Sequence, residues 1–114
     1  MTNCLFCKIA KGAIPAVKVA ETETLLAFLD IIPQAPTHIL IIPKKHIPNN
    51  LALDPVDKEM VGEVYLLANK IAKEKGIDAT GFRLVTNNGP DAGQAVFHLH
   101  FHLLGGRPMG WPPG

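Results

Sequence analysis

The chain has 114 residues, the length of a single domain. Hydrophobic residues make up 47% of it and charged residues 18%, so it can bury a core and disorder is excluded. The formal net charge of +1 excludes the strong basic field of a protein that binds a nucleic-acid polymer. The first residues lack a basic segment followed by a long apolar run. We therefore expect no secretion signal, no membrane span and a cytoplasmic location.

The first half of the chain predicts one short helix and three strands. Residues 4–12 form a short helix or turn that Gly12 stops. Two short β-type runs, 17–20 and 25–30, flank a polar turn and predict a hairpin. A loop with two prolines follows. Residues 37–43 are then the most apolar stretch, and we expect them to form the central strand.

The second half predicts one long helix and two strands. Asp54 and Pro55 are typical of a helix start, and apolar residues then recur every three or four positions. A helix of about 20 residues can cover one face of a small sheet. Residues 82–87 predict a fourth strand that pairs antiparallel with a fifth, and the tail 105–114 has no periodicity. The sequence therefore predicts one α+β domain over residues 1–114, with a five-stranded, mostly antiparallel sheet.

Three of the five histidines stand at spacing two, as His98, His100 and His102. Side chains alternate on a strand, so these imidazoles share one face and the apolar residues between them share the other. The apolar face needs a core, whereas the imidazole face suits a ligand, a metal or a substrate. Just before them, residues 87–93 form a glycine-bearing loop that can turn backbone N–H groups toward an anion.

A second chemical motif is the Cys-x-x-Cys of Cys4 and Cys7. In a reducing compartment these residues are thiols or metal ligands rather than a structural disulfide. A redox motif of this type follows a strand, and the residues before Cys4 are too few to form one. The pair is therefore half of a metal site.

The sequence resembles the histidine triad (HIT) family, whose His-x-His-x-His-x-x motif with apolar x occurs at residues 98–104. The similarity to the Hint branch covers nearly the whole chain. It is carried further by Phe28–Ile31, Pro36–His38, Ile42–His46, Asn87, Gly93–Gln94, Leu104–Arg107 and Trp111–Gly114. The resemblance implies a HIT-type fold and a homodimer whose two sheets join into one. It also implies a nucleotide-binding hydrolase of purine nucleoside phosphoramidates, of the adenosine 5'-monophosphoramidase type.

The family pattern implies catalytic roles for three histidines. His100 would be the nucleophile and form a nucleotidyl-histidine, which suits the chemistry because that intermediate is itself labile. Attack through Nε2 requires the other ring nitrogen to be held by a hydrogen bond, for which a backbone carbonyl is a candidate. His102 is implied as a phosphate ligand and a candidate proton donor to the leaving amine. His38 resembles the supporting histidine, which either acts directly or orients the triad.

The resemblance also implies the nucleotide-binding residues. Asp30 matches the carboxylate that accepts hydrogen bonds from both ribose hydroxyls; its alternative role is to cap a turn. The apolar slot for the base is implied to comprise Phe6, Ile14, Phe28 and Ile31, and the phosphate contacts to comprise Asn87, Gly93, Gln94, Ala95 and Val96. Trp111 is implied either to reach the neighbouring subunit's site or to be frayed. Ala95 stands where the eukaryotic Hint pattern has a serine; we expect activity to persist because backbone N–H groups remain.

Relatives that keep the cysteine pair bind zinc with two histidines that correspond here to His46 and His98. Together with Cys4 and Cys7 they form a Cys₂His₂ set suited to Zn²⁺. Such a zinc would brace the N-terminus and would not be required for chemistry. The alternative is two reduced thiols and an idle His46.

Three other functions compete with the phosphoramidase. The first is a metallohydrolase in which the three triad histidines bind zinc directly. The second is a dinucleoside polyphosphate hydrolase or nucleotidyl transferase. The third is a non-enzymatic nucleotide-binding scaffold.

Overall fold

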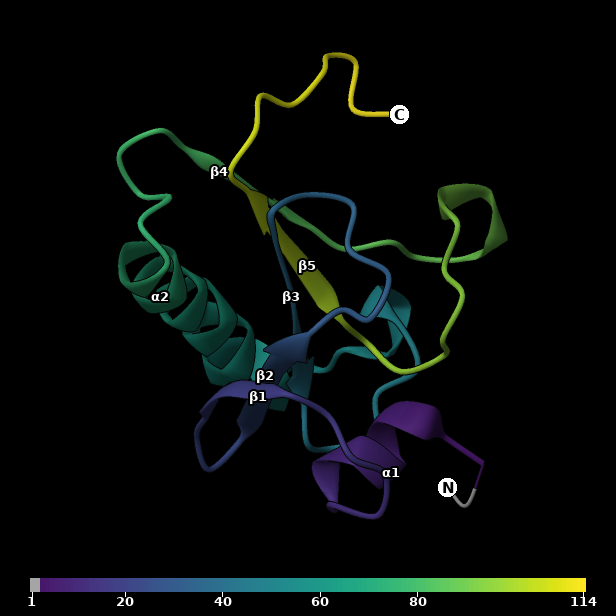
Figure 1. Ribbon diagram of the computed structural model, residues 1–114. Coiled ribbons are helices and arrows are strands. Elements are labelled where there is room, and N and C mark those ends of the chain that lie inside the picture. Colours follow the sequence, from purple (N-terminus) through teal and green to yellow (C-terminus); the bar gives the residue numbers. More distant parts are fainter. Residues whose placement is uncertain (1–2) are drawn as a thin grey trace.

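The computed structural model describes residues 3–114, which form a five-stranded sheet with one long and one short helix (Figure 1). The strands are β1 (Lys18–Glu21), β2 (Leu25–Leu29), β3 (Thr37–Pro43), β4 (Phe82–Val85) and β5 (Phe101–Gly105). Their order is β1-β2-β3-β5-β4, and every neighbouring pair is antiparallel. The predicted hairpin, the central position of β3 and the pairing of β4 with β5 are confirmed.

Helix α1 (Leu5–Ala10) is the predicted short helix, and α2 (Lys58–Glu74) is the predicted long one. The α-helical part starts later than predicted, because Pro55–Asp57 forms a 3₁₀ turn first. There the carboxylate of Asp57 accepts the backbone N–H of Asp54 at 2.9 Å, which stabilises the start of the helix. Two further 3₁₀ turns lie in loops, at Asn50–Ala52 and Pro90–Ala92.

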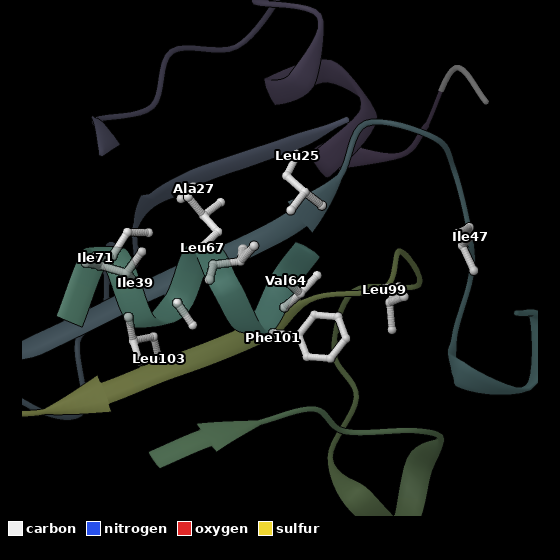
Figure 2. Close-up of a cluster of buried hydrophobic side chains, with 12 residues drawn as sticks. Leu25, Ala27, Ile39, Ile47, Val64, Leu67, Ile71, Leu99, Phe101 and Leu103 are labelled. Atoms are coloured by element: carbon white, nitrogen blue, oxygen red, sulfur yellow. The ribbon is translucent and has the colours of Figure 1, made fainter. Parts of the chain in front are cut away.

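The two faces of the sheet are covered differently. Helix α2 packs across one face, where its apolar residues meet those of β2, β3 and β5 (Figure 2). This core comprises Leu25, Ala27, Ile39, Ile41, Ile47, Val64, Leu67, Ala68, Ile71, Leu99, Phe101 and Leu103. The opposite face has a smaller cluster under α1, made of Phe6, Ile9, Leu26, Phe28, Leu40 and Ile42. None of the helices in the described chain is long and apolar enough to cross a membrane.

The histidine segment is only partly the strand that its alternation predicts. β5 starts at Phe101, so His98 and His100 lie before it. The reason is that β3 ends at Pro43 and its last pair with β5 is Ile41 with Phe101. Leu99 instead donates its N–H to the carbonyl of Ile47 in the loop after β3. The alternation of faces nevertheless holds, because the apolar residues of this segment join the α2 core and the imidazoles lie on the side of α1.

Candidate functional site

A mainly apolar cavity of about 400 Å³ opens on the α1 side of the sheet. Its walls come from α1, the segment after it, β2, β3 and the residues before and within β5. Of the predicted nucleotide-binding residues, the cavity brings together Phe6, Ile14, Phe28, Asp30, Ile31, Ala95, Val96, His100 and His102. A concave apolar surface with a few polar groups is typical of a small-molecule site.

The cavity wall also contains residues that the sequence did not single out, such as Leu5, Ile9, Ala16, Ile32 and Leu40. Leu40 points into it from the middle of the predicted central strand. It could have been found by alternation, since it lies between the core residues Ile39 and Ile41 and therefore on the other face.

The hydrogen bond of His100 fixes which of its ring nitrogens is free. Its Nδ1 lies 2.7 Å from the carbonyl oxygen of His98. A carbonyl only accepts, so Nδ1 carries the proton and the Nε2 of the neutral ring keeps its lone pair. The ring of Phe6 packs edge-on against His100 at a centroid distance of 5.2 Å. Because only 6% of His100 is exposed, the ring is held in one orientation at the cavity wall.

His102 is oriented in turn by His38. The backbone N–H of Gln34 donates to His38 Nδ1 at 3.0 Å, so the neutral His38 carries its proton on Nε2. That Nε2 lies 2.9 Å from His102 Nδ1 and 3.3 Å from a carboxylate oxygen of Asp30. His102 Nδ1 therefore accepts, and the proton of His102 sits on its Nε2.

Burial keeps both of these rings neutral. Desolvation, followed by the nearby His100 and His38, lowers the pKa of His102 to about 4. Desolvation also lowers the pKa of His38, although the carboxylate of Asp30 opposes this shift. At neutral pH the pair is therefore an uncharged, hydrogen-bonded unit beside the cavity.

Asp30 caps a turn, which is one of its two predicted roles, and it also lines the cavity, as the other role requires. One carboxylate oxygen accepts the N–H of Ile32 at 2.8 Å and caps the turn after β2. The other faces His38, and the carboxylate lines the cavity. A carboxylate offers about four lone-pair directions, so acceptor capacity remains for hydroxyl groups.

Gln94 has its whole amide engaged within the protein. Its side-chain oxygen accepts the N–H of Gly89 at 2.9 Å, and its NH₂ donates to the carbonyls of Pro48 and Val96 at 2.7 and 3.1 Å. Only 7% of the residue is exposed. The side chain thus ties together the glycine loop, the segment before β5 and the loop after β3. Sequence alone does not indicate this brace, because Pro48 is distant along the chain.

Gln94 does not line the cavity of the single chain. The same is true of three other residues predicted to contact the nucleotide: Asn87, Gly93 and Trp111. Asn87 lines a neighbouring groove at the end of β4. Gly93 ends the turn of the glycine loop with a φ of 82°, a conformation that favours glycine. Trp111 lies in the tail and is 84% exposed.

The predicted metal ligands converge at the N-terminus of α1. The Sγ of Cys4 and of Cys7 lie 3.2 and 3.5 Å from His98 Nδ1, and Cys7 Sγ lies 3.3 Å from His46 Nδ1. All four ligand atoms are within 4.8 Å of one another. His98 Nε2 donates to the carbonyl of Pro43 at 2.8 Å, so its Nδ1 presents a lone pair to the thiols.

This cluster fits a metal ion by its donor chemistry. Tetrahedral zinc with the usual Zn–S and Zn–N bond lengths separates neighbouring ligand atoms by roughly 3.3–3.8 Å. The S···N distances here are close to that range. The four residues can therefore bind a metal.

The three triad rings do not converge on one point. His98 faces the cysteines, whereas His100 and His102 line the cavity. Within residues 3–114, the other group with metal-ligating side chains in reach of one another is Asp30, His38 and His102. There His38 Nε2 already carries its proton, because the N–H of Gln34 occupies Nδ1. The geometry thus disfavours a zinc ion held by all three triad histidines.

Comparisons with known proteins identify the family of the chain. The family model of the HIT domain matches residues 11–109. An uncharacterized HIT-like protein of Synechocystis is 51% identical over 112 residues, covering 98% of this chain and 97% of its own. A 14 kDa zinc-binding protein of Zea mays is 50% identical over 112 residues, covering 96% and 87%.

Solved structures are similarly close. A HIT family hydrolase from Legionella pneumophila superposes with a TM-score of 0.96 at 54% identity, covering 98% of this chain and all of the other. A histidine triad protein from Clostridium difficile gives a TM-score of 0.93 at 47% identity, covering 96% of each chain. The chain belongs to the histidine triad (HIT) family.

Proposed function

We propose that this protein is a nucleotide-binding hydrolase of the Hint type, which cleaves the P–N bond of purine nucleoside 5'-phosphoramidates. The observation that carries the proposal is the orientation of His100. Its Nδ1–H donates a hydrogen bond to the carbonyl of His98, and its Nε2 lone pair is free at the wall of an apolar cavity. The similarity to a solved HIT family hydrolase supports hydrolysis as the reaction class.

The reaction proceeds in two displacements at phosphorus. The Nε2 of His100 attacks, the P–N bond breaks, and the amine leaves with the electron pair and takes up a proton. His102, whose Nε2–H is fixed by His38, is the nearby donor to the phosphoryl group or the amine. Water then attacks the nucleotidyl-histidine and releases the nucleoside monophosphate, which restores His100.

The cavity supplies the nucleoside contacts. Its apolar residues from α1 and β2, among them Phe6 and Phe28, offer flat surfaces for a purine base. Asp30 accepts hydrogen bonds from the two ribose hydroxyls, which selects ribose over deoxyribose. Gln94 acts through the loop that it braces, because its own amide is already satisfied.

We assign a structural zinc ion to the cluster of Cys4, Cys7, His46 and His98. The zinc-binding name of the maize relative supports this assignment. When bound, the ion supplies no step of the reaction. It would hold α1, one wall of the cavity, against the segments that carry His46 and His98.

We also propose that the protein is a homodimer in which two β4 strands lie side by side. β4 is an edge of the sheet, and an edge strand has unpaired backbone groups that can bond to another strand. The exposed Trp111 follows Gly110, whose carbonyl accepts a hydrogen bond from Arg83 of β4, so in the dimer it would have a partner's site to contact.

The proposed activity is tested by steady-state hydrolysis of adenosine 5'-phosphoramidate. The wild type is expected to release AMP, and His100→Gly to reduce kcat by at least about a thousandfold. Activity that survives exhaustive chelation excludes a metal-dependent mechanism, whereas loss of activity in chelated protein that keeps the hydrogen-exchange protection of α1 would favour the metallohydrolase. A wild-type kcat/KM near background would favour the scaffold. Faster turnover of a dinucleoside polyphosphate would favour the other hydrolase class.

A further inference from the structure

Helix α1 is held against the sheet by side chains alone (Figure 1). Among residues 3–114, every backbone hydrogen bond of residues 4–14 stays within that segment. The apolar anchors of α1 are Phe6 and Ile9, which pack on residues of β2 and β3. A helix of six residues is not stable alone, so its position depends on these side-chain contacts.

The polar contacts of this segment with the rest of the described chain all come from two sulfur atoms. Cys4 Sγ lies 3.2 Å from His98 Nδ1. Cys7 Sγ lies 3.5 Å from the same nitrogen and 3.3 Å from His46 Nδ1. A thiol can donate its proton to an imidazole, and a thiolate can share a metal ion with it. A disulfide has neither the proton nor the charge, so joining the two sulfurs removes every one of these contacts.

The two sulfur atoms are placed to be joined. Cys4 caps α1, and its Sγ accepts the N–H of Cys7 at 3.3 Å, so both side chains lie at the same end of the helix. The two Sγ atoms lie within 4.8 Å of each other. Cys-x-x-Cys pairs at the start of a helix form disulfides in other proteins. Closing the bond therefore needs little more than rotation of the two side chains.

The two cysteines differ in their access to solvent. Cys4 is half-buried and lines an open pocket of about 410 Å³ between the start of α1 and residues 95–97. Cys7 is only 7% exposed. A small oxidant that enters the pocket therefore meets Cys4 first. The pair lies beside α1, which packs on β2 and β3, whereas the proposed dimer uses β4 at the edge of the sheet.

We infer that Cys4 and Cys7 are a modification site for hydrogen peroxide, which joins them in a disulfide and releases α1 from His46 and His98. Peroxide attacks Cys4, and Cys7 closes the disulfide. The pair precedes every strand of the described chain, whereas the motif of a redox enzyme follows a strand. Its oxidation therefore acts on this protein itself and not on a protein substrate.

The chemistry balances in two steps. The sulfur of Cys4 takes one oxygen atom from hydrogen peroxide and becomes a sulfenic acid, and one water leaves. The sulfur of Cys7 then attacks the Cys4 sulfur, the S–O bond breaks, and the hydroxide leaves with the thiol proton as a second water. The two thiols supply the two electrons that reduce the peroxide, and a reducing thiol restores both cysteines. A cluster loaded with zinc loses two of its four ligands in this reaction.

Release of α1 changes one wall of the nucleotide cavity. Leu5, Phe6 and Ile9 line that cavity. The ring of Phe6 also packs edge-on against His98 and His100, at centroid distances of 6.0 and 5.2 Å. We expect the disulfide to raise the Kd for AMP by at least about fivefold, the lower end of the usual coupling between two sites. This effect rests on the proposed nucleotide binding, whereas the thiol chemistry does not.

The test treats the wild type, purified without chelator, with hydrogen peroxide and measures the intact mass under non-reducing conditions. We expect the loss of two hydrogen atoms, no thiol left for iodoacetamide, and release of any bound zinc to a chromogenic chelator at the same rate. Amide hydrogen exchange should become faster in α1 but not in the buried turns of α2. Dithiothreitol with zinc should restore both mass and protection, which distinguishes the disulfide from methionine sulfoxide.

Two variants test the order of the steps. Cys7→Ser should stop at the sulfenic acid of Cys4, which dimedone traps. Cys4→Ser should give no dimedone adduct, because the remaining thiol is buried. Lys11→Ser, an exposed position at the other end of α1, is the matched control and should oxidise like the wild type. Because either cysteine variant weakens α1, a brief peroxide pulse on the wild type with dimedone present repeats the test, and the adduct should map to Cys4.

The outcomes separate this inference from the proposed function. A disulfide between two chains, a sulfinic acid without a disulfide, or unreacted thiols overturn the modification site. A disulfide within one chain that leaves exchange in α1 unchanged overturns the release of the helix. Faster exchange with an unchanged Kd for AMP overturns the effect on the cavity. If neither the reduced nor the oxidised protein binds AMP, the proposed function fails and the thiol chemistry stands.

Discussion

The orientation of single imidazoles determines what the site can do. His98, His100 and His102 stand two positions apart in the sequence, yet the Nδ1 of each ring has a different partner. It faces thiols in His98, a backbone carbonyl in His100 and another imidazole in His102. These contacts fix His98 and His102 as the Nε2–H tautomer and His100 as the Nδ1–H tautomer. The same residue type therefore supplies a candidate metal ligand, a free lone pair and an N–H donor within five residues.

The neutral state of His102 links folding to pH. Its pKa is about 4 in the folded protein and about 6.5 in an unfolded chain. Between these values the unfolded chain binds more protons, so stability is complete above pH 6.5 and is lost as the pH falls toward 4. Between pH 7 and pH 5, the wild type should lose roughly 2 kcal/mol more free energy of unfolding than His102→Gln.

Urea unfolding at several pH values measures this difference. The other titratable groups are the same in both proteins, so the comparison isolates the contribution of His102. Parallel stability profiles of wild type and variant would show that His102 is not held neutral by burial.

Ala95 tests how far the site depends on backbone donors. It lies on the cavity wall and offers no hydroxyl group. Because backbone N–H groups of the same turn are unaffected, Ala95→Ser should change kcat/KM for a phosphoramidate by less than about tenfold. A gain of about 10²–10³-fold, the effect of one oxyanion donor elsewhere, would show that a missing hydroxyl limits this enzyme.

At the scale of elements, the proposed zinc ion would stabilise α1. A helix of six residues is not stable alone, and two of the four cluster residues, Cys4 and Cys7, lie at its start. We expect about one zinc per chain in protein purified without chelator. Cys7→Ser should lower the zinc content and speed amide hydrogen exchange in α1 but not in the buried turns of α2.

The matched control is Lys11→Ser, an exposed position at the other end of α1, which should keep both zinc and exchange protection. Metal-free wild-type protein with a protected α1 would contradict the assignment. Elemental analysis and exchange mass spectrometry provide the two measurements.

The elements differ in how well sequence predicted them. The hairpin of β1 and β2 and the helix α2 follow from local periodicity and turn residues, so they were predictable. The start of β5 was not, because Leu99 bonds to Ile47, a residue of a distant loop. The cavity around His100 follows from the family motif. The brace of Gln94 depends on contacts between segments far apart in the chain, which no local pattern contains.

At the scale of the whole molecule, the two faces of the sheet differ: one carries the main hydrophobic core and the other carries the candidate site. Helix α2 closes one face with a continuous apolar core, whereas the other face holds the cavity and the cysteine cluster. The edge strand β4 remains free for a second copy. Sedimentation equilibrium at micromolar concentration should give the mass of two chains. The mass of one chain would contradict the proposed dimer.

The central claim is that the nucleotidyl group is transferred from the amine to the free Nε2 of His100 and then to water. The direct measurement is mass spectrometry of protein quenched shortly after mixing with adenosine 5'-phosphoramidate, followed by peptide mapping. We expect one nucleotidyl group on His100 in the wild type and none in His100→Gly. Turnover of the substrate with no adduct at any time point, or an adduct on another residue, would contradict the account.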